Sequence, residues 1–441
     1  IFNYRDADNF RNILTINMED NMEKIIVRGG RKLQGEVDIS VAKNAVLPII
    51  VATILNPTEI ILRKVPMLED VTVLINLLRE LNCEVKFSPI TGDLKINTLN
   101  LKEIESNNEL IRKMRASFLV MGPMLARFGR CKISMPGGCN IGSRPVDLHL
   151  KGFKALGIDS EIGYGYVDAK IKDLHGNRIY LDFPSVGATE NIMMTSVFAP
   201  GTTIIENAAE EPEIWDLARF LNSMGAKIEG AGYGRITIHG VSELKQPEPF
   251  TPIFDRIEAG TFMVAAGITN SKITINGVNE EHLMPTIEKL KECGVYCKIN
   301  GDKMIVDGTG EKRPVDIKTM PYPGFPTDMQ AQMMALLSVT KGASVITETV
   351  FENRFMHVGE LGRMGANIKI DGRIAIVDGV DNLTGCPVKA TDLRAGAAMI
   401  LAGLVANGQT EIGEIYHIDR GYTNIEDKFR KLGAEIYRTY K

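Results

Sequence analysis

A short pattern of apolar and polar positions recurs six times along the chain. The copies read LRELNCEV (78–85), FKALGIDS (153–160), LNSMGAKI (221–228), LKECGVYC (290–297), LGRMGANI (361–368) and FRKLGAEI (429–436). Five copies carry glycine at the same point and the first carries Asn82. Glycine and asparagine readily adopt the left-handed conformation that closes a helix, and the residues that follow alternate as in a strand. We therefore predict a helix, a cap and a strand in each copy.

A second pattern precedes each copy: a helix of small and apolar residues, a polar break and a β-rich run. Examples are RIEAGTFMVAAGITNSKITING, DMQAQMMALLSVTKGASVITET and DLRAGAAMILAGLVANGQTEIGEI. A helix that is apolar on nearly every side is buried, and its alanine and glycine residues permit close packing. Each repeated unit is therefore predicted to contain a buried helix, a strand, a loop, an amphipathic helix and a second strand.

The proline-rich run QPEPFTP (246–252) separates units three and four. We predict an α/β protein of two similar domains with three units each. One domain comprises residues 43–250, and the other comprises residues 251–441 together with residues 22–42. A strand within residues 22–40 precedes the first buried helix, and the pattern alone leaves open which half this segment up to residue 40 joins. A cleft between the halves is the default ligand site.

Composition narrows the function classes. A chain of 441 residues predicts two or three domains, and a net charge of −4 gives no reason to expect nucleic acid as a partner. No apolar run reaches 18 residues, so no membrane-spanning helix is expected. Residues 1–21 lack the apolar core of a signal peptide and are expected to be an extension or leader, with the protein in the cytoplasm. The six cysteines form neither a disulfide framework nor a zinc-binding pattern.

The segment PGGCNIGSRPVDLH (136–149) is much longer than the matching loop of the other units. Its glycines allow open backbone conformations, and Arg144 lies five residues from Cys139, where it could lower the pKa of the thiol. This pattern suggests a mobile loop that carries a reactive cysteine. A surface turn with an inert cysteine is the alternative.

Basic residues gather at the starts of predicted buried helices and in loops after strands. Helix N-termini carry unpaired N–H groups and partial positive charge, and guanidinium groups suit phosphate and carboxylate. Any one of these residues could be an ordinary surface cation, but their recurrence favours an anion site. They are Lys43, Arg115, Arg144, Arg354, Arg394 and Arg420.

Asp328 opens a predicted buried helix in FPTDMQAQ, where Thr327 could serve as the N-cap. A favourable interaction with the helix dipole would by itself explain this acid. We interpret His357 and His417 as packed, hydrogen-bonding residues rather than catalysts. No glycine-rich nucleotide-binding fingerprint follows a strand, so a Rossmann site is not supported.

Nine motifs together resemble one family, the UDP-N-acetylglucosamine 1-carboxyvinyltransferases, from about Met22 to the C-terminus. Such enzymes are one of two kinds of enolpyruvyl transferase. The motifs are SVAKNAVLP, KMRASFLVMGP, PGGCNIGSRPVDLH, SVGATENIM, ENAAEEPEI, FPTDMQAQ, TETVFENRFMHV, ATDLRAG and IYHIDRGY.

The resemblance implies two inside-out α/β domains, each with three buried helices beneath outward sheets, and an active site between them. It implies transfer of the enolpyruvyl group of phosphoenolpyruvate to the 3-hydroxyl of UDP-N-acetylglucosamine, the first committed step of peptidoglycan synthesis. The reaction would pass through a tetrahedral phosphate ketal by addition and elimination. No metal, organic cofactor, nucleic acid or membrane partner is implied.

The resemblance also implies roles for individual residues. Cys139 would protonate the methylene carbon of phosphoenolpyruvate and be alkylated by fosfomycin, and Asp328 would take the proton of the 3-hydroxyl. Lys43, Arg144 and Arg420 would hold phosphate and carboxylate, while Arg115, Arg354, Arg394 and Glu211 would line the same cleft. Sugar-nucleotide contacts would come from Asn44, Pro145, Val146, Asp147, Leu148, Ser185, Val186, Gly187, Asp328 and Val350.

Two positions depart from familiar members: Glu69 and Phe183 stand where some members carry lysine, and both are expected near the nucleotide. One rival is the shikimate-pathway enolpyruvyl transferase, against which PGGCNIGSRPVD argues. Another rival is a regulatory paralogue that binds the sugar nucleotide without catalysis. Loss of Cys139, Asp328 or Lys43 would indicate that paralogue, and all three are present.

Overall fold

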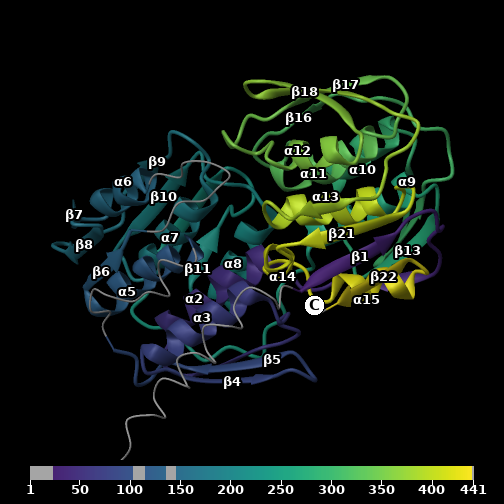
Figure 1. Cartoon of the computed structure of the whole chain (residues 1–441). Coiled ribbons are helices and arrows are strands. Elements are labelled where there is room, and N and C mark those ends of the chain that lie inside the picture. The colour runs from purple at the N-terminus through teal and green to yellow at the C-terminus, as the bar shows by residue number, and fades with distance from the viewer. Residues whose placement is uncertain (1–22, 103–114, 136–145, 440–441) are drawn as a thin grey trace, which may run out of the picture.

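The chain forms two lobes (Figure 1). The computed structural model describes residues 23–102, 115–135 and 146–439, with backbone alone for 115–117. One hydrophobic cluster runs from Val41 to Phe250 and is the core of what we call lobe 1. A second cluster combines residues near the N-terminus with residues 257–436 and is the core of lobe 2. We propose that the two lobes are the two predicted domains.

Six buried helices form the cores of the lobes, as the small, apolar segments predict. In α9 all 13 residues are buried, and α9, α11 and α13 pack against one another in lobe 2. A Cβ atom at Gly260 would lie 2.7 Å from the sulfur of Met329, so the side chain of Met329 packs directly against the backbone of α9. The helices are α2 (Lys43–Ala52), α5 (Met121–Phe128), α7 (Val186–Ser196), α9 (Arg256–Ile268), α11 (Gln330–Leu337) and α13 (Leu393–Gly403).

Six amphipathic helices end at the predicted caps. The cap residues Asn82, Gly157, Gly225, Gly294, Gly365 and Gly433 all have positive φ, from +69° at Asn82 to +100° at Gly225. The left-handed conformation predicted for the repeated glycine or asparagine is thus confirmed in every copy. The helices are α3 (Glu69–Glu80), α6 (Asp147–Ala155), α8 (Pro212–Ser223), α10 (Met284–Glu292), α12 (His357–Arg363) and α15 (Ile425–Lys431).

Strands follow the helices of every unit, as predicted. Those after the buried helices are β3 (Glu59–Leu62), β6 (Arg130–Ser134), β10 (Thr202–Glu206), β13 (Lys272–Asn276), β17 (Ala343–Thr347) and β21 (Gln409–Gly413). Those after the caps are β4 (Glu84–Ser88), β7 (Ile158–Gly163), β11 (Lys227–Glu229), β14 (Tyr296–Asn300), β18 (Asn367–Asp371) and β22 (Glu435–Thr439).

A third strand lies between the other two strands of each unit and pairs antiparallel with both, and the sequence pattern predicted it only in unit six, as part of the N-terminal strand. Four sheets also gain a short parallel strand at one edge. The third strands are β5 (Asp93–Asn97), β8 (Tyr166–Ile171), β12 (Arg235–His239), β15 (Lys303–Asp307), β19 (Ile374–Asp378) and, for unit six, β1 (Lys24–Arg28). The edge strands are β9 (Arg178–Tyr180), β2 (Glu36–Asp38), β16 (Ile317–Lys318) and β20 (Pro387–Lys389).

The first two strands belong to sheets of lobe 2. Strand β1 lies between β21 and β22, with Ile25 opposite both Ile412 and Arg438 (Figure 1). Strand β2 pairs in parallel with β13. This pairing answers the question that the sequence pattern left open about the segment up to residue 40.

The chain crosses between the lobes twice, and the two crossing segments lie side by side. Val41 and Phe254 form an antiparallel bridge, and the N–H of Asp255 donates to the carbonyl of Ser40 at 2.8 Å. Asp255 caps the start of α9, and its carboxylate also accepts from the backbone N–H of Lys43, at 3.3 Å. The N-termini of α2 and α9 therefore meet at the junction of the lobes. Within the described ranges, no helix is long and apolar enough to cross a bilayer.

Candidate active site

Three charged side chains from the two lobes meet at this junction. Lys43 is the first residue of α2, Asp70 lies in the first turn of α3, and Arg420 follows the short helix α14 (Tyr416–Asp419) of lobe 2. The ammonium nitrogen of Lys43 lies 2.7 Å from the carboxylate of Asp70, and Nε of Arg420 lies 2.9 Å from it. Lys43 and Arg420 were predicted from the sequence, whereas Asp70 was not. Asp70 thus holds two predicted phosphate-binding cations together.

Burial perturbs both partners of this ion pair. Burial lowers the pKa of Lys43, and the negative charge of Asp70 opposes that effect. Burial would raise the pKa of Asp70, but the charges of Lys43 and Arg420 outweigh it and the pKa is lowered. Arg394 and Arg420 also lower the pKa of Lys43, so these three cations lie within electrostatic range of one another.

A second group surrounds Asp328, which lies in a 3-10 turn (Thr327–Met329) before α11. Arg354 Nη2 donates to its carboxylate at 2.8 Å and Arg394 Nη2 donates at 3.0 Å. Burial would raise the pKa of Asp328, but the two guanidinium groups hold it far below the ordinary value. Asp328 is therefore an ionised carboxylate at neutral pH.

The guanidinium group of Arg394 keeps unused donors. Arg394 is 2% exposed, its guanidinium group lies over the ring of Tyr422, and its Nε and Nη1 have no hydrogen-bond partner among the described residues. A buried charged donor without a partner is costly, so its position suits an acceptor supplied by a ligand. Across the two groups, Lys43, Arg354, Arg394 and Arg420 form ion pairs with the carboxylates of Asp70 and Asp328. The arrangement can bind a small anion with more than one negative charge.

An acidic group lies beside these cations. Glu211 precedes α8, and burial raises its pKa to about 7. Arg256 pairs with the nearby Glu213 at 3.0 Å, and the charges of Glu211 and Asp328 contribute to the raised pKa of Arg256. Glu190 of α7, which the sequence did not single out, has a pKa raised by burial and by Glu213 and Glu211. Glu211 and Asp328, both predicted to share the site, are thus linked electrostatically through Arg256.

Thr327 corrects one expectation. No side-chain cap hydrogen bond forms at this turn; its hydroxyl donates instead to Oε2 of Glu348, at 2.9 Å. No local signal pointed to Glu348, because the two residues are 21 positions apart in the chain. Hydrogen bonding to a buried side chain here replaced the local capping bond.

Several predicted sugar-nucleotide residues begin helices of lobe 1. Val146 precedes α6, and the hydroxyl of Ser185 caps α7 by accepting from the N–H of Ala188 at 3.3 Å. A Cβ atom at Gly187 would lie 3.3 Å from the ring of His149, so the starts of α6 and α7 are neighbours. Asn44 is half-buried beside Lys43. A common role of these residues in binding stays a prediction.

Some predicted residues cannot be placed. Cys139, Arg144 and Pro145 lie outside the described residues, as does the side chain of Arg115. His357 is buried, as expected, and burial lowers its pKa to about 4. A hydrogen bond with the backbone of Arg354 opposes that shift, and the hydrogen bonding expected of His357 stays a prediction.

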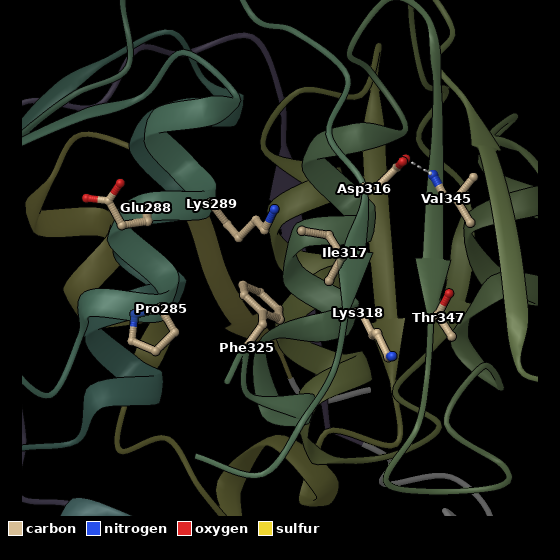
Figure 2. A pocket seen from close by; sticks show the side chains of 9 residues that line it. All are labelled: Pro285, Glu288, Lys289, Asp316, Ile317, Lys318, Phe325, Val345 and Thr347. Carbon is tan, nitrogen blue, oxygen red and sulfur yellow. Dashed lines mark hydrogen bonds between the residues drawn. The ribbon is translucent and has the colours of Figure 1, made fainter. Parts of the chain in front are cut away.

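Two cavities lie apart from these groups. One, of about 490 Å³, lies between α10 and the strands β16 and β17 and is lined by Pro285, Ile317, Phe325 and charged residues (Figure 2). The other, of about 310 Å³, lies at the C-terminal ends of α9, α11 and α13. Neither is lined by a predicted site residue.

Comparison with solved structures identifies the fold. The enolpyruvyl transferase NikO from Streptomyces tendae matches with a TM-score of 0.85 and 24% identity, covering 96% of this chain and 100% of that one. EPSP synthase from Acinetobacter baumannii matches with a TM-score of 0.72 and 17% identity, covering 95% and 100%. The predicted enolpyruvyl transferase fold is confirmed.

Comparison of sequences identifies the family. The family model described as EPSP synthase (3-phosphoshikimate 1-carboxyvinyltransferase) matches residues 27–429. UDP-N-acetylglucosamine 1-carboxyvinyltransferases from Clostridium tetani and Clostridium acetobutylicum are each 63% identical over 417 residues, which are 95% of this chain and 100% of the relative. The protein of that name from Caldanaerobacter subterraneus is 61% identical over 94% of this chain and 99% of its own. The chain therefore belongs to the family of UDP-N-acetylglucosamine 1-carboxyvinyltransferases.

Proposed function

We propose that the protein transfers the enolpyruvyl group of phosphoenolpyruvate to the 3-hydroxyl of UDP-N-acetylglucosamine and releases phosphate. The observation that carries this proposal is the meeting of Lys43, Asp70 and Arg420 across the two lobes, within electrostatic range of the Asp328 group. One end of such a site suits a phosphorylated anion, and the other offers an ionised carboxylate to a hydroxyl. The names of the 63% identical relatives support the same reaction.

On the donor side, Lys43 and Arg420 bind the phosphate of phosphoenolpyruvate together with Arg144. Cys139 gives a proton to the methylene carbon, which creates cationic character at C2. The 3-hydroxyl attacks C2 to form a tetrahedral phosphate ketal, and loss of the C–O bond to phosphate with removal of a methyl proton then restores the enol ether. Cations fixed around the phosphate stabilise its charge throughout.

On the acceptor side, Asp328 receives the proton of the 3-hydroxyl. A carboxylate whose pKa is held low by Arg354 and Arg394 is a weak base. It therefore takes the proton as the oxygen attacks the cationic carbon, when that proton becomes acidic. Arg394 keeps Nε and Nη1 for the substrate carboxylate.

The proposal includes the finer expectations from the sequence. Fosfomycin alkylates Cys139, the enzyme acts in the cytoplasm, and the reaction begins peptidoglycan synthesis. The shikimate-pathway reaction is the second candidate, because the matching family model carries the name EPSP synthase. The matching solved structures are less than 25% identical and support the fold alone.

Phosphate release from phosphoenolpyruvate tests the proposal. It is measured without acceptor, with UDP-N-acetylglucosamine and with shikimate 3-phosphate, for the wild type and for Cys139→Ala. We expect release that requires the sugar nucleotide, falls in the variant and is blocked by fosfomycin. Release with shikimate 3-phosphate alone would establish the second candidate, and no release with either acceptor would leave a binding paralogue.

A further inference from the structure

The carboxyl group of Glu348 joins two segments on either side of Asp328. Glu348 follows β17 and is 1% exposed. Its Oε2 accepts from the hydroxyl of Thr327 at 2.9 Å, and its Oε1 accepts from the N–H groups of Val350 at 2.9 Å and Phe351 at 3.1 Å. One buried carboxyl group therefore connects the turn of Asp328 to the loop of Val350.

These contacts close a ring of interactions around Asp328. Thr327 precedes Asp328 in the chain, and Asp328 pairs with Arg354 at 2.8 Å. Arg354 lies three residues after Phe351, which returns to Glu348. The hydrogen bond of Thr327 to Glu348 is one link of this ring, and without it the turn of Asp328 would be free to move away from the loop of Val350. The bond therefore limits the movement of Asp328 relative to Val350.

Two simpler explanations account for part of this arrangement. The bonds from Val350 and Phe351 are local and could form in any turn that begins with an acidic side chain. A hydroxyl of Thr319 also donates to Oε1, at 2.8 Å, which ties the turn to β16. None of these three bonds to Oε1 requires the other oxygen, Oε2, to face Thr327. The hydrogen bond between Thr327 and Oε2 is therefore the one contact of Glu348 described above that the stability of its own turn does not explain.

We propose that Glu348 is a positioning residue for the acceptor half of the site. Acting through Thr327, it fixes the distance between the carboxylate of Asp328 and the backbone at Val350, and so aligns the acceptor hydroxyl. This inference rests on the proposed function. It predicts that disturbing Glu348 impairs use of the sugar nucleotide and leaves the binding of phosphoenolpyruvate by Lys43 and Arg420 largely intact.

Thr327→Val tests the long-range bond, because it removes the hydroxyl and keeps the shape of the side chain. Thr340→Val is the matched control: the buried hydroxyl of Thr340 donates to Leu336 O at 2.9 Å beyond the other end of α11. We expect Thr327→Val to lower kcat/KM for the sugar nucleotide about 10-fold or more, with KM for phosphoenolpyruvate within about twofold. Thr340→Val should lower the thermal midpoint similarly and leave both kinetic constants unchanged.

Glu348→Gln and Glu348→Ala provide the second comparison. The amide oxygen of glutamine can keep the three donors at Oε1, and the hydroxyl of Thr327 can turn to accept from the amide nitrogen. Glu348→Gln should therefore retain most of the wild-type kcat/KM, whereas Glu348→Ala should lose at least as much as Thr327→Val. The same split between the two substrates is expected in the alanine variant.

The outcomes separate the two proposals. A wild type that releases no phosphate with UDP-N-acetylglucosamine refutes the proposed function and this inference with it. An active wild type in which Thr327→Val and Thr340→Val behave alike refutes the inference alone. A rise in KM for phosphoenolpyruvate as large as the fall in kcat/KM for the sugar nucleotide would also refute it, because that result indicates a general loss of structure.

Discussion

Replacing Asp70 by asparagine removes the charge that joins the two lobes at Lys43 and Arg420. The side chain keeps its size, so the change is electrostatic. Lys43 and Asp70 are nearly inaccessible to solvent, whereas 37% of the side chain of Arg420 is exposed. The variant therefore leaves Lys43 as a buried cation without a counter-charge, while water can solvate Arg420.

The size of the effect follows from these exposures. Breaking a buried ion pair by removing one partner costs about 3–5 kcal/mol, and the exposure of Arg420 favours the lower end, about 3 kcal/mol. For a lobe of this size each kcal/mol shifts the thermal midpoint by about 2–4 °C, so we expect a fall of about 6–12 °C. The pKa of Lys43, already lowered by burial, falls further without Asp70.

The pH dependence has a definite sign. A lysine whose pKa is lowered on folding destabilises the folded state most where it must stay charged, at low pH. The loss of stability in Asp70→Asn is therefore largest in mildly acidic buffer and shrinks as pH rises through the lowered pKa of Lys43. The alkaline limb of kcat/KM for phosphoenolpyruvate should move to lower pH. Inorganic phosphate should raise the midpoint of the variant more than that of the wild type, because it restores a counter-charge.

Thermal unfolding with and without phosphate, together with a pH profile of kcat/KM, measures these effects. Glu292→Gln is the control, since Glu292 pairs with Lys289 at the same 2.7 Å separation on the surface. An exposed pair contributes roughly 0.5 kcal/mol, so the control should be close to the wild type. A wild-type midpoint and an unmoved alkaline limb in Asp70→Asn would refute the view that Asp70 keeps Lys43 charged.

Three further predictions concern other parts of the molecule. The pKa of Glu211 is raised from 4.5 to about 7, so its neutral form contributes stability at low pH that is lost as pH rises through 7. Glu211→Gln should remove this decrease in thermal midpoint, and equal slopes of midpoint against pH in wild type and variant between about pH 5 and 8 would contradict the assignment. Phe183 is 44% exposed just before α7, so Phe183→Lys should tighten UDP-N-acetylglucosamine binding about threefold at low salt, with the gain lost at high salt in titration calorimetry. Gly225 has a φ of +100°, and a Cβ atom there would meet no other part of the protein within 4 Å, so Gly225→Ala should cost about 1–2 kcal/mol from backbone conformation alone; an unchanged thermal midpoint would refute this.

Local signals in the sequence predicted the units of the fold well. The left-handed caps depend on the residue at a single position, and even Asn82, the exception to glycine, adopts the expected conformation. The third strand of units one to five was missed because the recurring patterns stop at the strand after the cap, and the third strand follows it, as β15 follows β14 and β19 follows β18. The place of β1 also escaped prediction, since its partners lie near the other end of the chain.

The residues of the site also fall into those that local sequence signals predicted and those that they did not. The cations Lys43, Arg394 and Arg420 were found because basic residues recur at equivalent points of the repeat. Asp70 and Glu348 were not, because each acts through partners that lie far away in the sequence: Asp70 and Arg420 are 350 positions apart. A buried carboxylate that organises other functional groups has no local signature. Its role becomes visible when the contacts between distant parts of the chain are known.

The position of β1 also bears on the order of folding during synthesis. Lobe 1 is formed by a continuous stretch of chain, whereas the sheet of β20, β21, β1 and β22 needs residues from both ends. During translation lobe 1 can fold while β1 still lacks its partners β21 and β22, which leave the ribosome after all of lobe 1. Contacts of such long sequence separation form slowly. Lobe 2 should therefore be the later and more vulnerable lobe to fold, and removal of the last strand would expose one edge of β1 to unwanted pairing with other chains.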